Sequence, residues 1–183
     1  MQGLVAAVVT PMTDDGELNL GLIPSIVDHL VASEIRGIYI AGSTGEGMSL
    51  SDEERMAVAE AYLECSKGRM QAVVQVGHNS MKAAAALAAH AEGCGAGAIS
   101  ATPTGYFQAE GESGLVGLMA AIARGAPSTP FYYYHIPALS GASMNPMTFT
   151  EIAVKEIPTF CGIKYTDCLL YTSPSPRDGL LSR

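Results

Sequence analysis

The sequence is poor in basic residues. Its 183 residues include 10 Lys and Arg against 18 Asp and Glu, which gives a formal net charge of -8 at pH 7. No basic stripe runs along the chain, which argues against nucleic acid or an anionic membrane surface as a partner. No apolar run is long enough to cross a bilayer, and the first residues lack the pattern of a signal peptide. We therefore expect a cytoplasmic protein.

The common spacings of metal sites are also missing. The four cysteines are scattered and form no CxxC pair: Cys65, Cys94, Cys161 and Cys168. None of the four histidines belongs to a ligand pair of the HExxH type. The sequence thus predicts free thiols in a reducing compartment and no metal.

The chain is rich in hydrophobic residues, and its apolar segments alternate regularly with helical segments. Hydrophobic residues make up 48% of it and charged residues 15%, which excludes a disordered linker. Six apolar segments read as buried strands, with helical segments between them. The expected strands are residues 4–9, 37–41, 72–76, 97–101, 131–134 and 160–164. The expected helices are about residues 19–33, 51–67, 80–93, 112–124 and 146–156, and Asn19, Ser51 and Ser80 are expected to cap the first three.

Strands that alternate with helices predict right-handed βαβ units and a parallel sheet buried on both faces. A doubly wound sheet and a (β/α)8 barrel both satisfy this pattern. Segments 42–47 and 93–97 are rich in glycine, but neither is a GxGxxG motif that follows a strand. The lack of a dinucleotide site favours the barrel. Since a complete barrel needs about 250 residues, the fold class is α/β, a (β/α)8 TIM barrel with about six units present.

Two residues at strand ends could carry chemistry in such a barrel. Lys164 closes the sixth apolar strand, and a lysine there points into the mouth of a parallel barrel, where active sites lie. A desolvated amine can attack a ketone and form a Schiff base, whereas a lysine that reaches solvent is the alternative. Tyr134 ends the preceding strand, and a phenol beside an imine can transfer protons. Core packing is the alternative for Tyr134 and explains most of segment 132–134.

The loop 42–47 lies between a strand and a helix at the same rim of the expected barrel. Its backbone amides and the hydroxyls of Ser43 and Thr44 can hold a carboxylate, aided by the start of the helix. An ordinary glycine-rich turn explains the same residues. Glu46 could act as a base, although loop solvation or helix-end electrostatics accounts for it equally well.

Several of these segments together resemble a known family. Gly-Ser-Thr-Gly-Glu at 42–46, the segment 134–139 and Gly-Ile-Lys at 162–164 are similar to the pyruvate-dependent class I aldolases of the dihydrodipicolinate synthase/N-acetylneuraminate lyase group. The similarity extends from Gly3 to about Asp167. Segment 131–139 most resembles the lyase branch, which cleaves N-acetylneuraminate to N-acetylmannosamine and pyruvate.

Other functions stay open. A 4-hydroxy-tetrahydrodipicolinate synthase or another 2-keto-3-deoxy acid aldolase would fit the same family. A non-catalytic metabolite-binding α/β module is the alternative from another class. A lysine that faces Tyr134 discriminates between the classes, because a binding module has no need of one.

The resemblance implies roles for single residues. Lys164 would form the imine and Tyr134 would transfer protons. The substrate-binding residues would be Ser43 and Thr44, which hold the carboxylate of the pyruvyl group, Gly45, which lets the backbone approach, and Thr166. The iminium would serve as the electron sink, so that no metal or organic cofactor is needed. The partner would be a small keto acid or sugar acid, and the full-length protein would be a homotetramer.

The sequence departs from the family pattern in two places. Segment 104–106 replaces an aromatic-rich segment in which the family often has a tyrosine that crosses a subunit interface, so Tyr106 stays unassigned. Residues 168–183 resemble the translation of a transposon-end sequencing adapter, with a native tail rich in proline and serine as the alternative. We therefore expect a partial barrel aldolase domain over residues 1–167, a disordered non-native tail over 168–183, and a chain with little or no activity.

Overall fold

The computed structural model describes residues 3–167, in which six strands alternate with helices. The strands are β1 (Val5–Ala7), β2 (Gly37–Ile40), β3 (Gln71–Gln75), β4 (Ala98–Ala101), β5 (Phe131–His135) and β6 (Phe160–Tyr165). The helices are a 3-10 turn η1 (Leu20–Leu22), α1 (Ile23–Ala32), α2 (Asp52–Ser66), α3 (Met81–Gly93), α4 (Gly111–Ala123), α5 (Pro137–Ser140) and α6 (Pro146–Glu156). All six strands expected from the sequence are present. The expected tail and its boundary at residue 168 lie outside the described residues.

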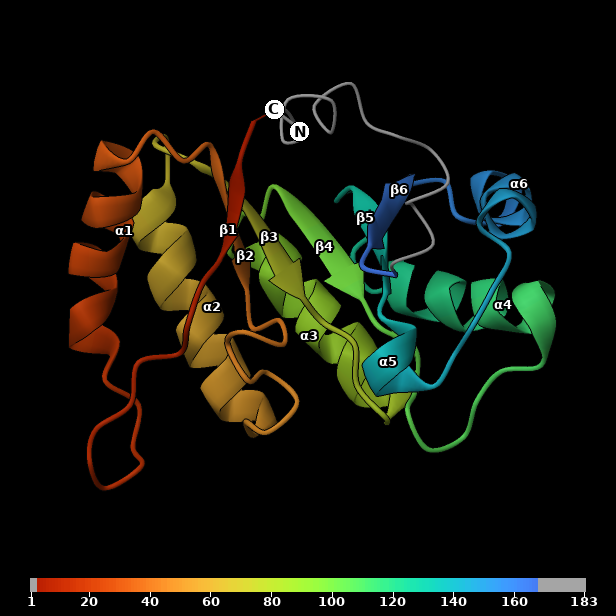
Figure 1. The fold of residues 1–183 in the computed structure, drawn as a ribbon, viewed down its shortest axis with the longest axis horizontal. Coiled ribbons are helices and arrows are strands. Elements are labelled where there is room, and N and C mark those ends of the chain that lie inside the picture. Colours follow the sequence, from red (N-terminus) through yellow and green to blue (C-terminus); the bar gives the residue numbers. More distant parts are fainter. Residues whose placement is uncertain (1–2, 168–183) are drawn as a thin grey trace, which may run out of the picture.

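All neighbouring strands pair in parallel, and their order in the sheet is their order in the sequence, from β1 to β6. A doubly wound sheet reverses its strand order at a switch point, whereas a barrel does not. Helices α1, α2, α3, α4 and α6 follow one another along the outer side of the curved sheet (Figure 1). The described residues therefore form an incomplete (β/α)8 TIM barrel, and the doubly wound alternative is wrong.

Local sequence signals explain most helix starts. In α2, the Ser51 side chain accepts a hydrogen bond from the Glu54 amide and the Glu54 carboxylate accepts one from the Ser51 amide, so the expected capping box is confirmed. The Ser80 hydroxyl caps α3 by accepting from the Ala83 amide. The expected helix cap at Asn19 is wrong. The chain makes the 3-10 turn η1 directly after Asn19, and the Asn19 side chain forms no capping hydrogen bond. The α-helix begins at Ile23, so that Pro24 lies in the first turn, where its missing N–H costs nothing.

The main core lies between the sheet and the helices. Outward-facing strand residues such as Ile38, Val74 and Phe131 pack there against buried helix residues such as Val58 and Met119. A much smaller apolar cluster covers the inner face and consists of Tyr39, Val73, Ala98 and Tyr134. The outer layer is thus a complete hydrophobic core, whereas the inner face holds the few large side chains that surround a site.

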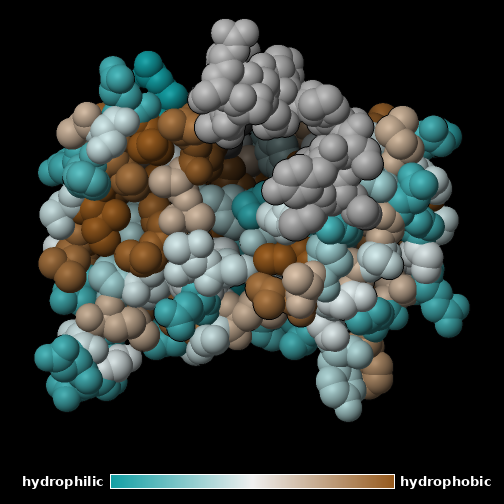
Figure 2. Space-filling model, viewed as in Figure 1, coloured by the Kyte–Doolittle hydropathy of each residue, from teal (hydrophilic) through white to brown (hydrophobic). Residues whose placement is uncertain are grey.

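The β1 edge of the sheet exposes apolar surface. Leu4, Val5 and Val9 are all exposed, and hydrophobic side chains gather over this part of the molecule (Figure 2). Within residues 3–167, β1 pairs only with β2 and β6 only with β5. Unpaired strand edges with exposed apolar side chains are surfaces that further strands cover in a closed barrel. Across the described residues, no helix has the length and apolarity that crossing a membrane requires.

Candidate active site at the carboxyl ends of the strands

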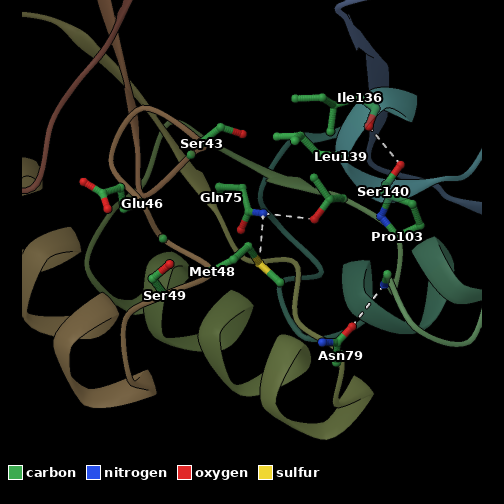
Figure 3. Close-up of a pocket in the computed structure, with 14 residues that line it drawn as sticks. Ser43, Glu46, Met48, Ser49, Gln75, Asn79, Pro103, Ile136, Leu139 and Ser140 are labelled. Carbon is green, nitrogen blue, oxygen red and sulfur yellow. Dashed lines mark hydrogen bonds between the residues drawn. The ribbon is translucent and has the colours of Figure 1, made fainter.

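The loops that follow β2, β3, β4 and β5 surround a pocket of about 340 Å³. Figure 3 shows Ser43, Gln75 and Ser140 around this pocket, and they come from the loop after β2, the end of β3 and the end of α5. Its lining consists of Gly42, Ser43, Glu46, Gly47, Met48, Ser49, Gln75, Asn79, Thr102, Pro103, Gly105, Ile136, Leu139 and Ser140. The pocket therefore lies at the end of the barrel where active sites are found in this fold.

The loop after β2 is tightly folded against the strand ends. A Cβ atom on Gly47 would lie 1.9 Å from the Ala41 carbonyl oxygen, and one on Gly45 would lie 2.9 Å from the Val8 carbonyl oxygen. Ala41 and Glu46 have positive φ angles of 53° and 51°, a region that side chains disfavour. Backbone strain of this kind persists where the surrounding structure imposes it, often at functional sites. The glycines thus permit the close packing that holds Ser43 at the pocket.

A buried arginine supports the floor of the pocket. The Arg55 side chain, only 2% exposed, donates hydrogen bonds to the Gly77 carbonyl (2.9 Å), the Gln75 carbonyl (2.8 Å) and the Gln75 side-chain oxygen (2.7 Å). Gln75 in turn donates to the Thr102 hydroxyl at 3.1 Å. Burial lowers the pKa of Arg55 to about 10, so its side chain stays charged at neutral pH. This chain of hydrogen bonds fixes the ends of β3 and β4 beneath the pocket.

Tyr134 connects the loop to Lys164. Its hydroxyl lies 3.2 Å from the Ser43 hydroxyl, within hydrogen-bond distance. The Lys164 amine lies over the aromatic ring of Tyr134, with Nζ 3.5 Å from the ring centroid. The same amine is 5.0 Å from the centroid of the Tyr39 ring, which meets the Tyr134 ring edge to face. Three residues singled out in the sequence, Ser43, Tyr134 and Lys164, therefore lie together.

Lys164 lines a second cavity, of about 240 Å³, on the inner face of the sheet. The other lining residues are apolar or aromatic: Val5, Ala7, Tyr39, Val73, Tyr132 and Ile163. The Lys164 side chain is half-buried, whereas burial raises the pKa of the neighbouring Tyr39 phenol far above its ordinary value. An amine in such apolar surroundings has few competing polar partners, which suits a nucleophile.

Three other expected site residues are placed differently. Thr44 is exposed and Gly45 is buried, and neither belongs to the lining of the 340 Å³ pocket in the described residues. The Gly45 carbonyl accepts a hydrogen bond from the Thr10 hydroxyl at 2.7 Å. The exposed Thr166 donates its hydroxyl proton to the His135 carbonyl at 2.7 Å. Direct contacts thus join Ser43, Tyr134 and Lys164, whereas Gly45 contacts Thr10 and Thr166 contacts His135.

Other polar residues considered from the sequence have mixed placements. Glu46 lines the pocket with an exposed side chain, which fits either a base or a solvated loop residue. Tyr106 is 83% exposed and its ring contacts Phe107 edge to face. His135 is only 2% exposed, lies 3.8 Å from the Asp167 carboxylate and stacks on Tyr165. His135 therefore belongs to the packed structure and not to the pocket.

Sequence reasoning missed Arg55, Gln75 and Thr102. Gln75 is the last residue of β3 and follows the apolar segment 72–74, and that position is a usable signal for an active-site residue. Arg55 carries no such signal, since an arginine in a charged first helical turn usually reaches solvent. Helix α5 was also missed, although Pro137 at its start and Gly141 after its end are helix boundary residues.

Comparisons with known proteins relate the chain to one family of sequences and folds. A family model described as the Dihydrodipicolinate synthetase family matches residues 1–172. The N-acetylneuraminate lyase of Xenopus tropicalis is 42% identical over 169 residues, which cover 91% of this chain and 55% of that protein. The N-acetylneuraminate lyase of Gallus gallus is 40% identical with the same coverage of both chains.

A solved structure extends the likeness to three dimensions. The Proteus mirabilis N-acetylneuraminate lyase superposes with a TM-score of 0.90 at 36% identity, covering 93% of this chain and 58% of that one. The chain spans about half the length of the curated relatives it matches. The similarity therefore covers nearly all of this sequence and little more than half of each relative's length.

Proposed function

Because the chain belongs to the dihydrodipicolinate synthetase family, we propose that the whole protein is a Schiff-base aldolase that cleaves N-acetylneuraminate to N-acetylmannosamine and pyruvate. The relatives named above are N-acetylneuraminate lyases, at 42% and 40% identity. A synthase that makes 4-hydroxy-tetrahydrodipicolinate is the second candidate, since the family model takes its description from such enzymes.

The proposal rests above all on one observation. Lys164, Tyr134 and Ser43 come from β6, β5 and the loop after β2, and they meet through the 3.5 Å and 3.2 Å contacts at Tyr134. An amine, a phenol and a hydroxyl supply the nucleophile, the proton carrier and the carboxylate donor that the reaction needs. A binding module has no use for this combination.

The chemistry follows from these three groups. The Lys164 amine attacks the C2 ketone of the open-chain sugar acid, and loss of water gives an iminium. The Tyr134 phenol gives its proton to the departing water as the iminium forms. The resulting phenolate accepts the proton of the C4 hydroxyl while the C3–C4 bond breaks, and the electron pair moves to the iminium nitrogen. N-acetylmannosamine leaves, and the remaining enamine is protonated at C3. Hydrolysis of the resulting imine then releases pyruvate and restores the amine.

The pocket residues take supporting roles in this proposal. Ser43 orients the Tyr134 hydroxyl and donates to the substrate carboxylate, and Thr44 and the backbone at Gly45 approach the same carboxylate from the loop. Thr166 lies near the sugar once substrate is bound. The lysine iminium is the electron sink, so we propose that the reaction uses neither a metal nor an organic cofactor.

The remaining expectations belong to the whole protein. We propose a homotetramer in the cytoplasm that acts on a small keto acid or sugar acid. We also propose that residues 1–167 form the barrel portion. Residues 168–183, whose sequence departs from the family pattern, are non-native in this proposal. The family membership and the acidic composition of the chain support these proposals.

The test uses a completed chain, in which residues 3–167 are followed by the remaining segment of the Xenopus tropicalis relative. Release of N-acetylmannosamine and pyruvate from N-acetylneuraminate is the expected result. Condensation of pyruvate with aspartate semialdehyde, without lyase activity, would replace the leading proposal by the second. Failure of both reactions, together with failure to trap pyruvate with borohydride, would leave the binding module as the function.

A further inference from the structure

A separate group of ligand-type side chains lies on the outer layer of the barrel. Glu60 of α2, His90 of α3 and Cys94 just after α3 each direct one ligand atom to a common point. The carboxylate oxygen, the imidazole Nε2 and the sulfur all lie within 4.8 Å of one another. None of the three residues lines the active-site pocket or the Lys164 cavity.

Local structure holds these side chains in place. His90 and Cys94 are four residues apart, which puts them on the same face at the end of one helix. The Cys94 amide donates to the His90 carbonyl at 3.0 Å, and the Cys94 side chain packs against the main core. Both side chains are half-buried, whereas Glu60 is exposed and reaches them from the neighbouring helix α2.

The distance between His90 and Cys94 matches the spacing that a tetrahedral metal ion imposes, whereas Glu60 and His90 are at hydrogen-bond distance. With ordinary bond lengths, Zn²⁺ holds a nitrogen and a sulfur ligand about 3.6 Å apart, and a nitrogen and an oxygen ligand about 3.3 Å apart. In the structure, Cys94 Sγ is 3.7 Å and Glu60 Oε1 is 2.8 Å from His90 Nε2. A shift of the exposed Glu60 side chain by about 0.5 Å would give the nitrogen–oxygen spacing, and the same movement must bring the oxygen to about 3.6 Å from the sulfur, from which it now lies within 4.8 Å.

We propose that Glu60, His90 and Cys94 form a binding site for a borderline-soft divalent cation, with Zn²⁺ as the best match and water as its fourth ligand. Thiolate, imidazole and carboxylate are the ligand types that Zn²⁺ prefers. On binding, the Cys94 thiol releases its proton to solvent, and the neutral His90 ring carries its proton on Nδ1, so that Nε2 bonds to the metal. The thiolate and carboxylate then balance the two charges of the ion.

The position of the site favours a cation and links two elements. Carbonyl groups at the end of α3 give this end of the helix a partial negative charge. A metal bound here joins α2 to α3 and thereby clamps two neighbouring units of the outer layer. The site does not depend on the proposed aldolase chemistry, because it shares no residue with the site of that reaction.

The test is a titration of the reduced, EDTA-treated 183-residue chain with Co²⁺ as a spectroscopic probe. We expect one Co²⁺ per chain, with a thiolate-to-cobalt charge-transfer band and the visible bands of tetrahedral cobalt, both removed by added Zn²⁺. C94S, H90Q and E60Q should each weaken binding by at least about tenfold, since even outer partners of a metal ion typically contribute that much. Zn²⁺ should also raise the unfolding temperature of the original chain but not that of C94S.

The matched controls are C65S and H29Q, which replace the same residue types outside the cluster. Both should bind Co²⁺ like the original chain. Circular dichroism identifies any variant that fails to fold, and the remaining cluster variants then decide the outcome. The proposal is overturned if the original chain gives no charge-transfer band, or if C65S loses the band while C94S keeps it.

Discussion

The two sides of the candidate active site differ in how far the described residues complete them. On the loop side, Ser43 lies on a tightly packed turn, and the buried Arg55 and Gln75 have hydrogen-bond partners beneath it. On the lysine side, Lys164 is only half-buried and Thr166 is exposed. The loop side is built on strands β2 to β4, each with a neighbour on both edges, whereas β6 pairs only with β5 within residues 3–167.

This difference distinguishes the positions of the reacting groups, which the described residues determine, from the closure of the site, which needs further barrel units. The position of Lys164 relative to Tyr134 follows from the register of β5 and β6, in which the two residues are direct partners. The closure of its surroundings depends on strands that would pack between β6 and β1. The described strands β5 and β6 therefore determine the relative position of Tyr134 and Lys164. Exclusion of water from Lys164 depends on further strands.

The largest expected effect is that of completing the barrel. The completed chain should release N-acetylmannosamine from N-acetylneuraminate. The 183-residue chain should be inactive or nearly so, because no further strand pairs with β6 or β1 within residues 3–167. Both proteins are assayed for product and for resistance to protease at the same concentration. Equal product release and equal resistance would contradict the division into a complete and an incomplete side.

The next effect is that of Tyr134→Phe in the completed chain. The change removes the hydroxyl that bonds Ser43 but keeps the ring beneath Lys164. Turnover should fall by about 100- to 10,000-fold, the usual contribution of a general acid–base group. Circular dichroism should stay unchanged, and Tyr133→Phe is the matched control, because the Tyr133 ring packs in the outer core. A Tyr134→Phe enzyme with unchanged turnover would remove this residue from proton transfer.

Arg55→Met tests the support beneath the loop side. It leaves the Gln75 and Gly77 carbonyls without their donor in a buried place, so the free energy of unfolding should fall by about 3 kcal/mol. Arg69→Met is the control, because Arg69 forms an exposed pair with Asp28 that contributes at most about 1 kcal/mol. Urea unfolding of both variants gives the comparison, and equal losses would contradict a special role for Arg55.

A smaller effect is expected from His135, at the β5–β6 end of the sheet. Burial lowers its pKa below the ordinary value of 6.5, although the nearby Asp167 carboxylate opposes the shift. The unfolded chain therefore binds more protons than the folded chain just below pH 6.5, and stability should fall as the pH drops through this window.

Urea unfolding between pH 7.5 and about 5.5 measures this loss. His135→Gln should flatten the dependence, whereas a change at the exposed His29, His29→Gln, should leave it unaltered. A variant of His135 with the original pH dependence would show that another group titrates.

The sequence was sufficient for the alternating strands and helices, because apolar segments of strand length lie between capped helices. It also predicted that Ser43, in the loop after β2, lies at the same rim as Tyr134 and Lys164, which are near the ends of β5 and β6. It could not predict the hydrogen bonds of Arg55. Their acceptors lie 20 and 22 positions further along the sequence and reach Arg55 only because α2 packs against β3.

The cluster of Glu60, His90 and Cys94 could not be predicted from the sequence for the same reason. Two of its members have a recognisable helical spacing, but the third comes from another helix, so the group exists only after α2 and α3 pack together. Thr166 was named as a substrate-binding residue from the family resemblance alone, and in this structure its hydroxyl donates to the His135 carbonyl.

The most direct test of the account is to locate the residue that forms an imine with pyruvate. The completed chain is incubated with pyruvate and borohydride, digested, and its peptides are weighed by mass spectrometry. We predict a reduced pyruvyl adduct on the peptide that contains Lys164, and its loss in Lys164→Ala but not in Lys155→Ala. An adduct on another lysine, or an undiminished adduct in Lys164→Ala, would contradict the assignment of Lys164 as the nucleophile.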